Sequence, residues 1–143
     1  MPLNFSEILK NHALSRPDKV FCTKLKEESI TFLELDAYVN KCCNYLNDLG
    51  LSKGDIVTVT LPNSLSSIIL YFASIRAGLI INPCPSTLSE SELKNNINFV
   101  SSNLLVSRKL INEEDLDSSL LQLMVDSDSH FMKLIDDYDA SQY

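Results

Sequence analysis

The sequence predicts an α/β protein in which an N-terminal β-hairpin precedes a parallel β-α-β-α-β unit, a Rossmann-like arrangement of three layers. The run Ile56–Leu61 is β-branched almost throughout, which is typical of a buried central strand. Two further short apolar runs, Leu79–Asn82 and Leu104–Val106, follow at intervals of about two dozen residues, and a helical pattern precedes each of them. This spacing suits parallel strands that are joined by right-handed helical crossovers.

The N-terminal segment predicts a short helix and then the hairpin. Asn4 can cap the helix, and Pro17 ends it because the residue before a proline disfavours the helical region. Val20–Lys26 and Ile30–Phe32 are expected to form the two strands, with the turn at Glu27–Ser29.

The clearest helix of the chain follows the hairpin. Thr31 and Glu34 form a capping-box pattern at its start, and Gly50 lies where a left-handed residue usually ends a helix. Between them, apolar residues recur at steps of about three and four, as an amphipathic helix requires. These residues are Leu35, Val39, Cys42, Leu46 and Leu49.

Two helices are predicted between the strands of the parallel unit. Asn63 can cap a helix over Ser64–Ala77, which is apolar on most faces and is therefore expected to be buried. Ser89 and Glu92 form another capping-box pattern, which opens a second helix.

The C-terminal part differs in charge from the rest. Residues 1–110 carry 11 basic and 10 acidic side chains, whereas residues 111–143 carry one basic and nine acidic. We predict a helix that begins at Asn112 and includes Leu123 and Met124, a short helix over His130–Tyr138, and a frayed end over Asp136–Tyr143. The chain therefore divides into residues 1–110 and an acidic helical extension over 111–143, which is either a solvated surface or a docking surface for a basic partner.

Composition excludes several classes of protein. The net charge of −7 and the lack of clustered basic residues argue against a nucleic-acid partner. The longest apolar stretch, Ile68–Ile81, is short for a membrane span and contains Arg76, so no span is expected. The N-terminus does not resemble a signal peptide, which predicts a cytoplasmic protein whose four cysteines are free thiols without a zinc site.

Few residues are candidates for chemistry. After Gly78 the sequence contains no glycine, so it has no glycine-rich loop of the kind that binds phosphate. His12 is expected to be an ordinary boundary residue, and His130 has Asp126 and Asp128 near it in the sequence. Asp55 is expected to bond the backbone of its turn, and Arg76 to offset the helix dipole. We therefore predict no catalytic, no cofactor-binding and no metal-binding residue in this chain.

Six short motifs follow one another in a defined order and spacing within about residues 5–106. They are Arg16–Val20, Ile30–Leu35, Leu49–Ser64, Phe72–Gly78, Asn82–Pro83 and Glu92–Leu93. This series resembles the N-terminal region of the AMP-forming ligase superfamily, which includes acyl-CoA synthetases, the adenylation domains of non-ribosomal peptide synthetases, and luciferases. Each motif is short, but their order and spacing together are specific.

The resemblance implies that the chain is a partial fold of a larger N-terminal domain, with the remainder of that ligase domain as its partner. The parent enzyme would activate a carboxylate with ATP to an acyl-adenylate and then form a thioester. ATP, magnesium, and CoA or phosphopantetheine are implied for that parent, and no cofactor is expected in this chain. The family's phosphate loop with Pro-Lys-Gly and its later motifs are absent, and Cys84-Pro85 follows Asn82-Pro83 where the family differs. No catalytic residue of the family can therefore be assigned here.

Two other interpretations remain. The chain can be a stand-alone, non-catalytic interaction module that reuses the ligase scaffold, with the acidic segment 111–143 as its docking surface. It can also be an unrelated flavodoxin-like domain, although no strand end offers a glycine loop or paired carboxylates. For the ligase fragment, we expect exposed apolar surface and self-association, because the matched region packs against the missing part.

Overall fold

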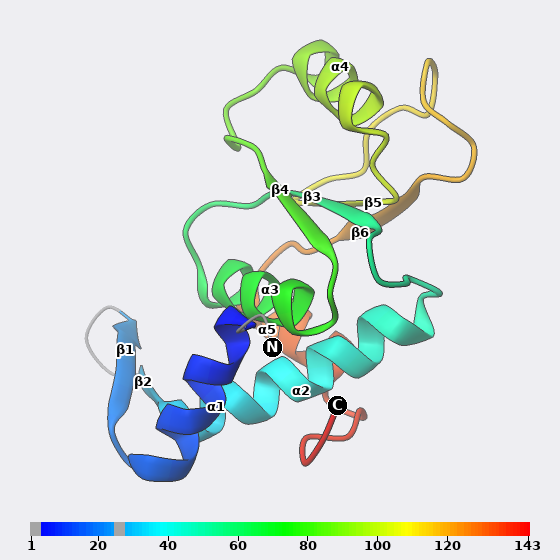
Figure 1. The fold of residues 1–143 in the computed structure, drawn as a ribbon. Helices are drawn as coiled ribbons and strands as arrows, with labels where there is room; N and C mark the ends of the chain where they lie inside the picture. Colours follow the sequence, from blue (N-terminus) through cyan, green and yellow to red (C-terminus); the bar gives the residue numbers. More distant parts are fainter. Residues whose placement is uncertain (1–3, 25–27) are drawn as a thin grey trace.

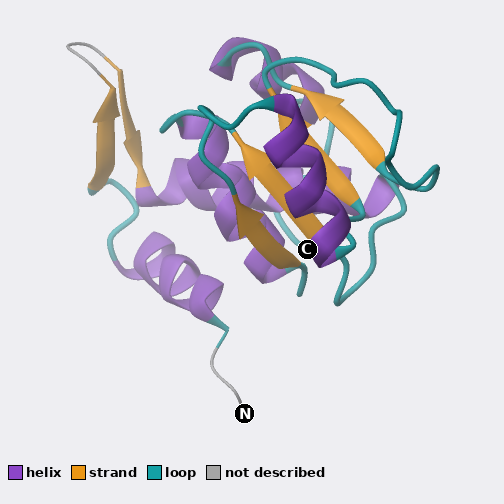
Figure 2. Cartoon of the chain, turned by 90° about the horizontal axis from the view of Figure 1, so that it is seen from above, coloured by secondary structure: helices purple, strands orange, loops and turns teal. Residues whose placement is uncertain are grey.

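A parallel sheet with helices on both of its faces forms the body of the protein, and a two-stranded hairpin stands at one side (Figures 1 and 2). The computed structural model describes residues 4–24 and 28–143. The elements are α1 (Phe5–Ser15), β1 (Val20–Lys24), β2 (Glu28–Thr31), α2 (Phe32–Asp48), β3 (Ile56–Thr60), α3 (Leu65–Arg76), β4 (Ile80–Pro83), α4 (Glu90–Val100), β5 (Leu104–Ser107), β6 (Leu121–Met124) and α5 (Asp128–Ile135).

The central sheet has the strand order β4-β3-β5-β6, and all neighbouring strands are parallel. Val57 of β3 pairs with Ile81 on one side and with Leu104 on the other. The three strands predicted from the sequence and their helical crossovers are confirmed, and so is the antiparallel pairing of β1 with β2. The predicted fold class is therefore confirmed.

The helix predicted from Asn112 is wrong. Residues 112–120 form turns, and β6 follows as a fourth strand beside β5. Asp115 has a left-handed φ of 64°, which a helix does not accommodate, and the Asp117 carboxylate accepts from the Ser119 N–H in a local turn. Leucines at helical spacing serve another purpose here: Leu116 and Leu120 cover a small apolar cluster on the α4 side of the sheet.

The two faces of the sheet bury different clusters. Leu104 and Val106 point to the main core, whereas Leu105 between them points to the smaller cluster under α4. Figure 1 shows α2, α3 and α5 on one side of the sheet and α4 on the other. The most completely buried large side chains of the main core include Leu35, Leu46, Ile69, Leu70, Phe131 and Ile135.

Local capping signals set the helix ends. The predicted capping boxes of Thr31 with Glu34 and of Ser89 with Glu92 are both present. Gly50 has a φ of 88°, which confirms the left-handed position at the end of α2. At α3 the cap is Ser64 rather than the predicted Asn63, because the Ser64 hydroxyl accepts from the Ser67 N–H.

The second strand of the hairpin begins earlier than predicted. Glu28 and Ser29 were expected in the turn but belong to strand β2, where Glu28 pairs with Lys24 of β1. The remaining part of the predicted turn, together with the end of the first predicted strand, falls at residues 25–27, outside the described residues.

Residues 136–143, here called the C-terminal strap, lie along α2 (Figure 1). The side chain of Asn40 donates to the Ala140 carbonyl at 2.9 Å, and that of Asn44 donates to the carbonyls of Asp139 and Gln142. Lys41 also pairs with Asp136 at 3.0 Å. The segment predicted to be frayed thus has no helix or strand, but α2 supplies partners for its backbone carbonyls.

Candidate functional site

The carboxyl edge of the parallel sheet is the natural place for a site in this fold. After β3 the chain passes to α3 on the main-core face, whereas after β5 it passes over the other face, where Ile111 and Leu116 are packed. The connections of these adjacent strands thus diverge, which opens a crevice between them. In open α/β sheets, ligands bind at such a point.

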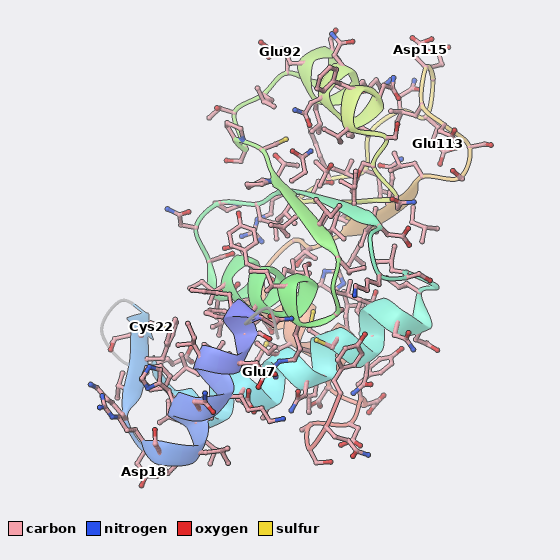
Figure 3. The ribbon with its side chains drawn as sticks, in the orientation of Figure 1. Glu7, Asp18, Cys22, Glu92, Glu113 and Asp115 are labelled. Carbon is pink, nitrogen blue, oxygen red and sulfur yellow. The ribbon has the colours of Figure 1, made fainter. Side chains whose placement is uncertain are left out.

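A cleft of about 1110 Å³ lies at this edge. One wall is formed by the ends of β5 and β6 and the starts of α3 and α5, and the opposite wall by the hairpin and the start of α2. Its apolar lining includes Tyr38, Leu65, Ile68 and Met132. Cys22 marks the hairpin wall in Figure 3.

The start of α3 would be the place for a phosphate, since N–H groups at a helix start bind anions. Here the protein itself supplies the acceptors. The Asp128 carboxylate accepts from the Ser66 N–H at 3.0 Å and from the Ser66 hydroxyl at 2.5 Å. The Ser64 hydroxyl accepts from the Ser67 N–H at 3.3 Å. These N–H groups are therefore already bonded within the chain.

The charges around the cleft also disfavour an anion. Among its described lining residues, the acidic ones are Glu28, Glu34, Asp126 and Asp128, and the basic one is Arg108. Arg108 donates to the Val125 carbonyl at 3.2 Å, which holds its guanidinium at the end of β6. The described lining residues therefore carry more acidic than basic groups.

His130 lies beside the cleft, near the acidic residues that the sequence placed around it. Its Nδ1 is 3.4 Å from the Asp126 carboxylate, and its N–H donates to Ser127, the cap of α5. Asp128, its other acidic neighbour in the sequence, turns to Ser66 instead. Among the residues the structure describes, no three His, Cys, Asp or Glu side chains are grouped so that they could hold a metal ion.

The other residues considered from the sequence lie apart from the cleft. His12 packs on the Phe32 ring, with 5.0 Å between centroids. The Asp55 carboxylate accepts from the Ser52 N–H at 2.8 Å, as predicted for its turn. Arg76 lies in the last turn of α3 as predicted, but its guanidinium also pairs with Asp36 at 2.6 Å.

Three of the four cysteines are buried, and none is an activated thiol. Burial raises the pKa of Cys42 well above its ordinary value and raises the pKa of Cys43 to about 12. Burial also raises the pKa of Cys22 and of Cys84. A raised pKa keeps a thiol protonated, and the protonated form is a poor nucleophile.

Sequence reasoning missed the cleft itself. From the sequence, Glu28 is assigned to a turn, and Asp126 and Asp128 are considered only as neighbours of His130. Nothing in the sequence indicates that these three acidic residues lie near the start of α3. One local signal was available: Ser127 and Asp128 precede Phe131 and Ile135 in the pattern of a capped, amphipathic helix.

No helix in the described part of the chain is long and apolar enough to cross a membrane.

Comparison with protein families gives one match over most of the chain. The family model described as "AMP-binding enzyme" matches residues 9–142.

Curated relatives match shorter stretches. A long-chain-fatty-acid–CoA ligase of Mycobacterium tuberculosis is 30% identical over 64 residues, which are 45% of this chain and 13% of the relative. A 2-succinylbenzoate–CoA ligase of Bacillus cereus is 31% identical over 85 residues, which are 59% of this chain and 17% of the relative. The matches thus span less than a fifth of either relative.

Solved structures share the fold. A Mycobacterium tuberculosis fatty acyl CoA synthetase superposes with a TM-score of 0.84 at 18% identity, over 98% of this chain and 29% of that one. The N-terminal subdomain of Klebsiella oxytoca NpsA, in complex with 3-hydroxybenzoyl-AMSN, gives a TM-score of 0.79 at 19% identity, over 98% of this chain and 33% of that one. The fold is thus that of the N-terminal subdomain of adenylation domains.

Proposed function

The chain belongs to the AMP-binding enzyme family, and from this membership we propose that it is the N-terminal part of an ATP-dependent, AMP-forming ligase that activates a carboxylate. In the whole enzyme the carboxylate attacks the α-phosphate of ATP, which releases pyrophosphate and leaves an acyl-adenylate. A thiol then attacks the acyl carbon, and AMP leaves as the thioester forms. The relatives support this reaction, since those named above are CoA ligases. CoA or a carrier-protein phosphopantetheine would supply the thiol.

Within that enzyme, we propose that these residues are scaffold and do not catalyse the reaction alone. The observation that carries this proposal is the absence of glycine from the 65 residues after Gly78, which leaves no loop able to surround phosphates closely. ATP phosphates do not fit the start of α3, because Asp128 already occupies it and its charge would repel a phosphate there. For magnesium, no three His, Cys, Asp or Glu side chains among the described residues are grouped so that they could hold the ion.

The remainder of the ligase domain is the partner we propose for this scaffold. Large apolar side chains are exposed on several elements, as expected of a surface that a further domain part covers. They include Phe5, Leu14, Ile80, Phe99 and Leu110.

Pyrophosphate release tests the non-catalytic role. We expect the purified 143-residue chain, given ATP, magnesium and a panel of carboxylates, to release no more pyrophosphate than a blank without protein. A fatty-acid–CoA ligase from among the relatives, assayed with a fatty acid, serves as the positive control. Carboxylate-dependent pyrophosphate above the blank would show that the chain is itself catalytic.

The reading frame downstream of Tyr143 tests the parent enzyme. We expect the transcript to continue into a Ser/Thr/Gly-rich loop that ends in Pro-Lys-Gly. A stop codon directly after Tyr143 would instead favour the stand-alone interaction module, and it would contradict the proposal.

A further inference from the structure

The cleft at the carboxyl edge has an apolar floor and an acidic rim, and this combination identifies the chemistry of an occupant. We propose that it binds a polypeptide segment in which apolar side chains are flanked by lysine or arginine. The proposal concerns binding by this chain alone, so its test is independent of the ligase activity proposed above.

The floor of the cleft comes from three helices. One half-buried side chain from each helix lines the cleft and packs against the main core: Tyr38 of α2, Ile68 of α3 and Met132 of α5. Their remaining exposed surface faces one cavity, because α2, α3 and α5 lie on the same side of the sheet (Figure 1). Covering that surface with apolar side chains would be favourable, since it removes apolar area from water.

The rim carries acidic groups from three separate elements. Glu28 on β2, Glu34 at the start of α2 and Asp126 after β6 are all exposed. Arg108, the basic residue among the described lining, is half-buried and donates to the Val125 carbonyl. The rim therefore attracts cationic groups placed around an apolar centre.

Other ligand classes fit less well. A nucleotide or a phosphorylated lipid would bring negative charge toward this rim, and the N–H groups that could bind its phosphate are bonded to Asp128 and Ser64. At about 1110 Å³ the open cleft has room for several side chains of an extended peptide. A polypeptide with basic and apolar side chains matches both the charge and the size of the cleft.

Fluorescence anisotropy of a labelled peptide tests the proposal. The probe is a short peptide that alternates lysine and leucine, titrated with the 143-residue chain at low ionic strength. Three analogues are matched to it: serine in place of leucine, glutamine in place of lysine, and glutamate in place of lysine. We expect the parent peptide to bind, the first two analogues to bind more weakly, and the glutamate analogue not to bind.

Variants of the rim show whether the cleft is the site. We expect Glu28→Gln with Asp126→Asn to weaken binding by about three- to tenfold, because each exposed charge contributes modestly. The matched control is Glu113→Gln with Glu114→Gln, which changes the net charge equally in an exposed loop. Figure 3 shows Glu113 at the opposite end of the molecule from Cys22, so this control should leave binding unchanged.

Variants of the floor test the apolar contribution. Met132→Gln should weaken binding, whereas Met124→Gln, at an exposed position of β6 outside the cleft, should not. Circular dichroism of each variant verifies the fold before it is titrated.

Three results would overturn the proposal. If the rim double variant and the control double variant weaken peptide binding equally, the effect comes from net charge and not from the cleft. If the serine analogue binds as tightly as the parent peptide, the apolar floor does not contribute to binding. A dimer that forms with rising concentration in sedimentation velocity, and that the rim variants abolish, would assign the cleft to a second copy of the chain.

Discussion

The Asp128 carboxylate accepts a hydrogen bond from the Ser66 N–H at 3.0 Å, and this bond ties the start of α5 to the start of α3. The two residues are separated by 62 positions in the sequence. An acidic side chain here stabilises α3 as a bound anion would, through the N–H groups and the positive end of the helix dipole. The Asp128 carboxylate thus occupies the place at the start of α3 where an anion would bind, and the bond holds one wall of the cleft in place.

Asp128→Ala should therefore destabilise the chain by about 1–3 kcal/mol, because the N–H and the hydroxyl of the buried Ser66 would both lose their acceptor. Urea unfolding followed by circular dichroism measures the change. Asp126→Ala is the matched control, since the exposed Asp126 carboxylate bonds the nearby Ser127 and His130, and the free energy of unfolding of this variant should stay within about 0.5 kcal/mol of the parent value. Equal losses in the two variants would contradict the tie between α3 and α5.

Arg76→Met should destabilise the chain more strongly, by about 3–5 kcal/mol. The side chains of Arg76 and Asp36 are only 9% and 16% exposed, and Arg76 also donates to Asn40 at 2.7 Å. Removing the cation leaves a largely buried carboxylate without its partner. Thermal or urea unfolding measures the effect.

The control for that pair is Lys94→Met. The Lys94 ammonium lies 3.4 Å from the Glu90 carboxylate, and the Glu90 side chain is 44% exposed. The loss of stability in this variant should stay below about 1 kcal/mol. Adding Asp36→Leu to Arg76→Met should recover part of the stability, because no uncompensated charge then remains. A double variant as unstable as the single one would show that the loss comes from packing alone.

Asn44→Ala should loosen the end of the C-terminal strap while α2 stays folded and Asn40 and Lys41 still hold the rest of the strap. The amide of Asn44 donates to the carbonyls of Asp139 and Gln142, and among the described residues no other side chain donates to those two oxygens. Hydrogen exchange should become faster over residues 137–143 and stay unchanged in the buried turns of α2. Asn47→Ala, at an exposed position of the same helix, should change neither region.

Alkaline pH should weaken the fold through the buried thiols. Burial raises the pKa of Cys43 from 9.0 to about 12, so between these values the folded chain keeps a proton that the unfolded chain has lost. Stability is then fully present below about pH 9 and falls as pH rises toward about 12, by at most about 1.4 kcal/mol per pH unit for this group.

Urea unfolding at about pH 8 and about pH 10 measures this loss. The variant Cys43→Ala should show a smaller decrease between the two pH values, although Cys42 still contributes. Cys22→Ala, at a half-buried position, should reduce the decrease less. An equal pH dependence in all three chains would locate the titrating groups elsewhere.

Most of the fold could be predicted because its signals are local. The capping boxes at Thr31 and Ser89 and the left-handed Gly50 follow from side chains within a few residues. The β-branched residues of β3 carry their own strand preference. These signals fixed the order of elements from α2 to β5.

The missed strand β6 has no such signal. Its four residues, Leu121–Met124, continue a run of leucines at helical spacing, and only pairing with β5 favours the extended conformation. The strap was missed for the same reason, since its partners on α2 lie about 100 residues earlier. Tertiary contacts decide both segments, and local propensity does not report them.

The candidate site was the least predictable part. Its walls come from the hairpin, α2, α3 and the ends of β5 and β6, so no single stretch of sequence contains it. From the sequence alone, the missing glycines predicted that the chain has no phosphate loop, and that expectation stays a prediction.

The clasp between α2 and the strap also bears on how the chain is made. Phe131 and Ile135 complete a core to which α2 and α3, much earlier in the chain, also contribute, and the amide of Asn40 donates to the carbonyl of Ala140, 100 positions later. On the ribosome, α2 and α3 therefore emerge long before the segment that covers them. The parts of α2 and α3 that pack against α5 stay exposed during this interval, and transiently exposed apolar surface is what makes a nascent chain prone to aggregation.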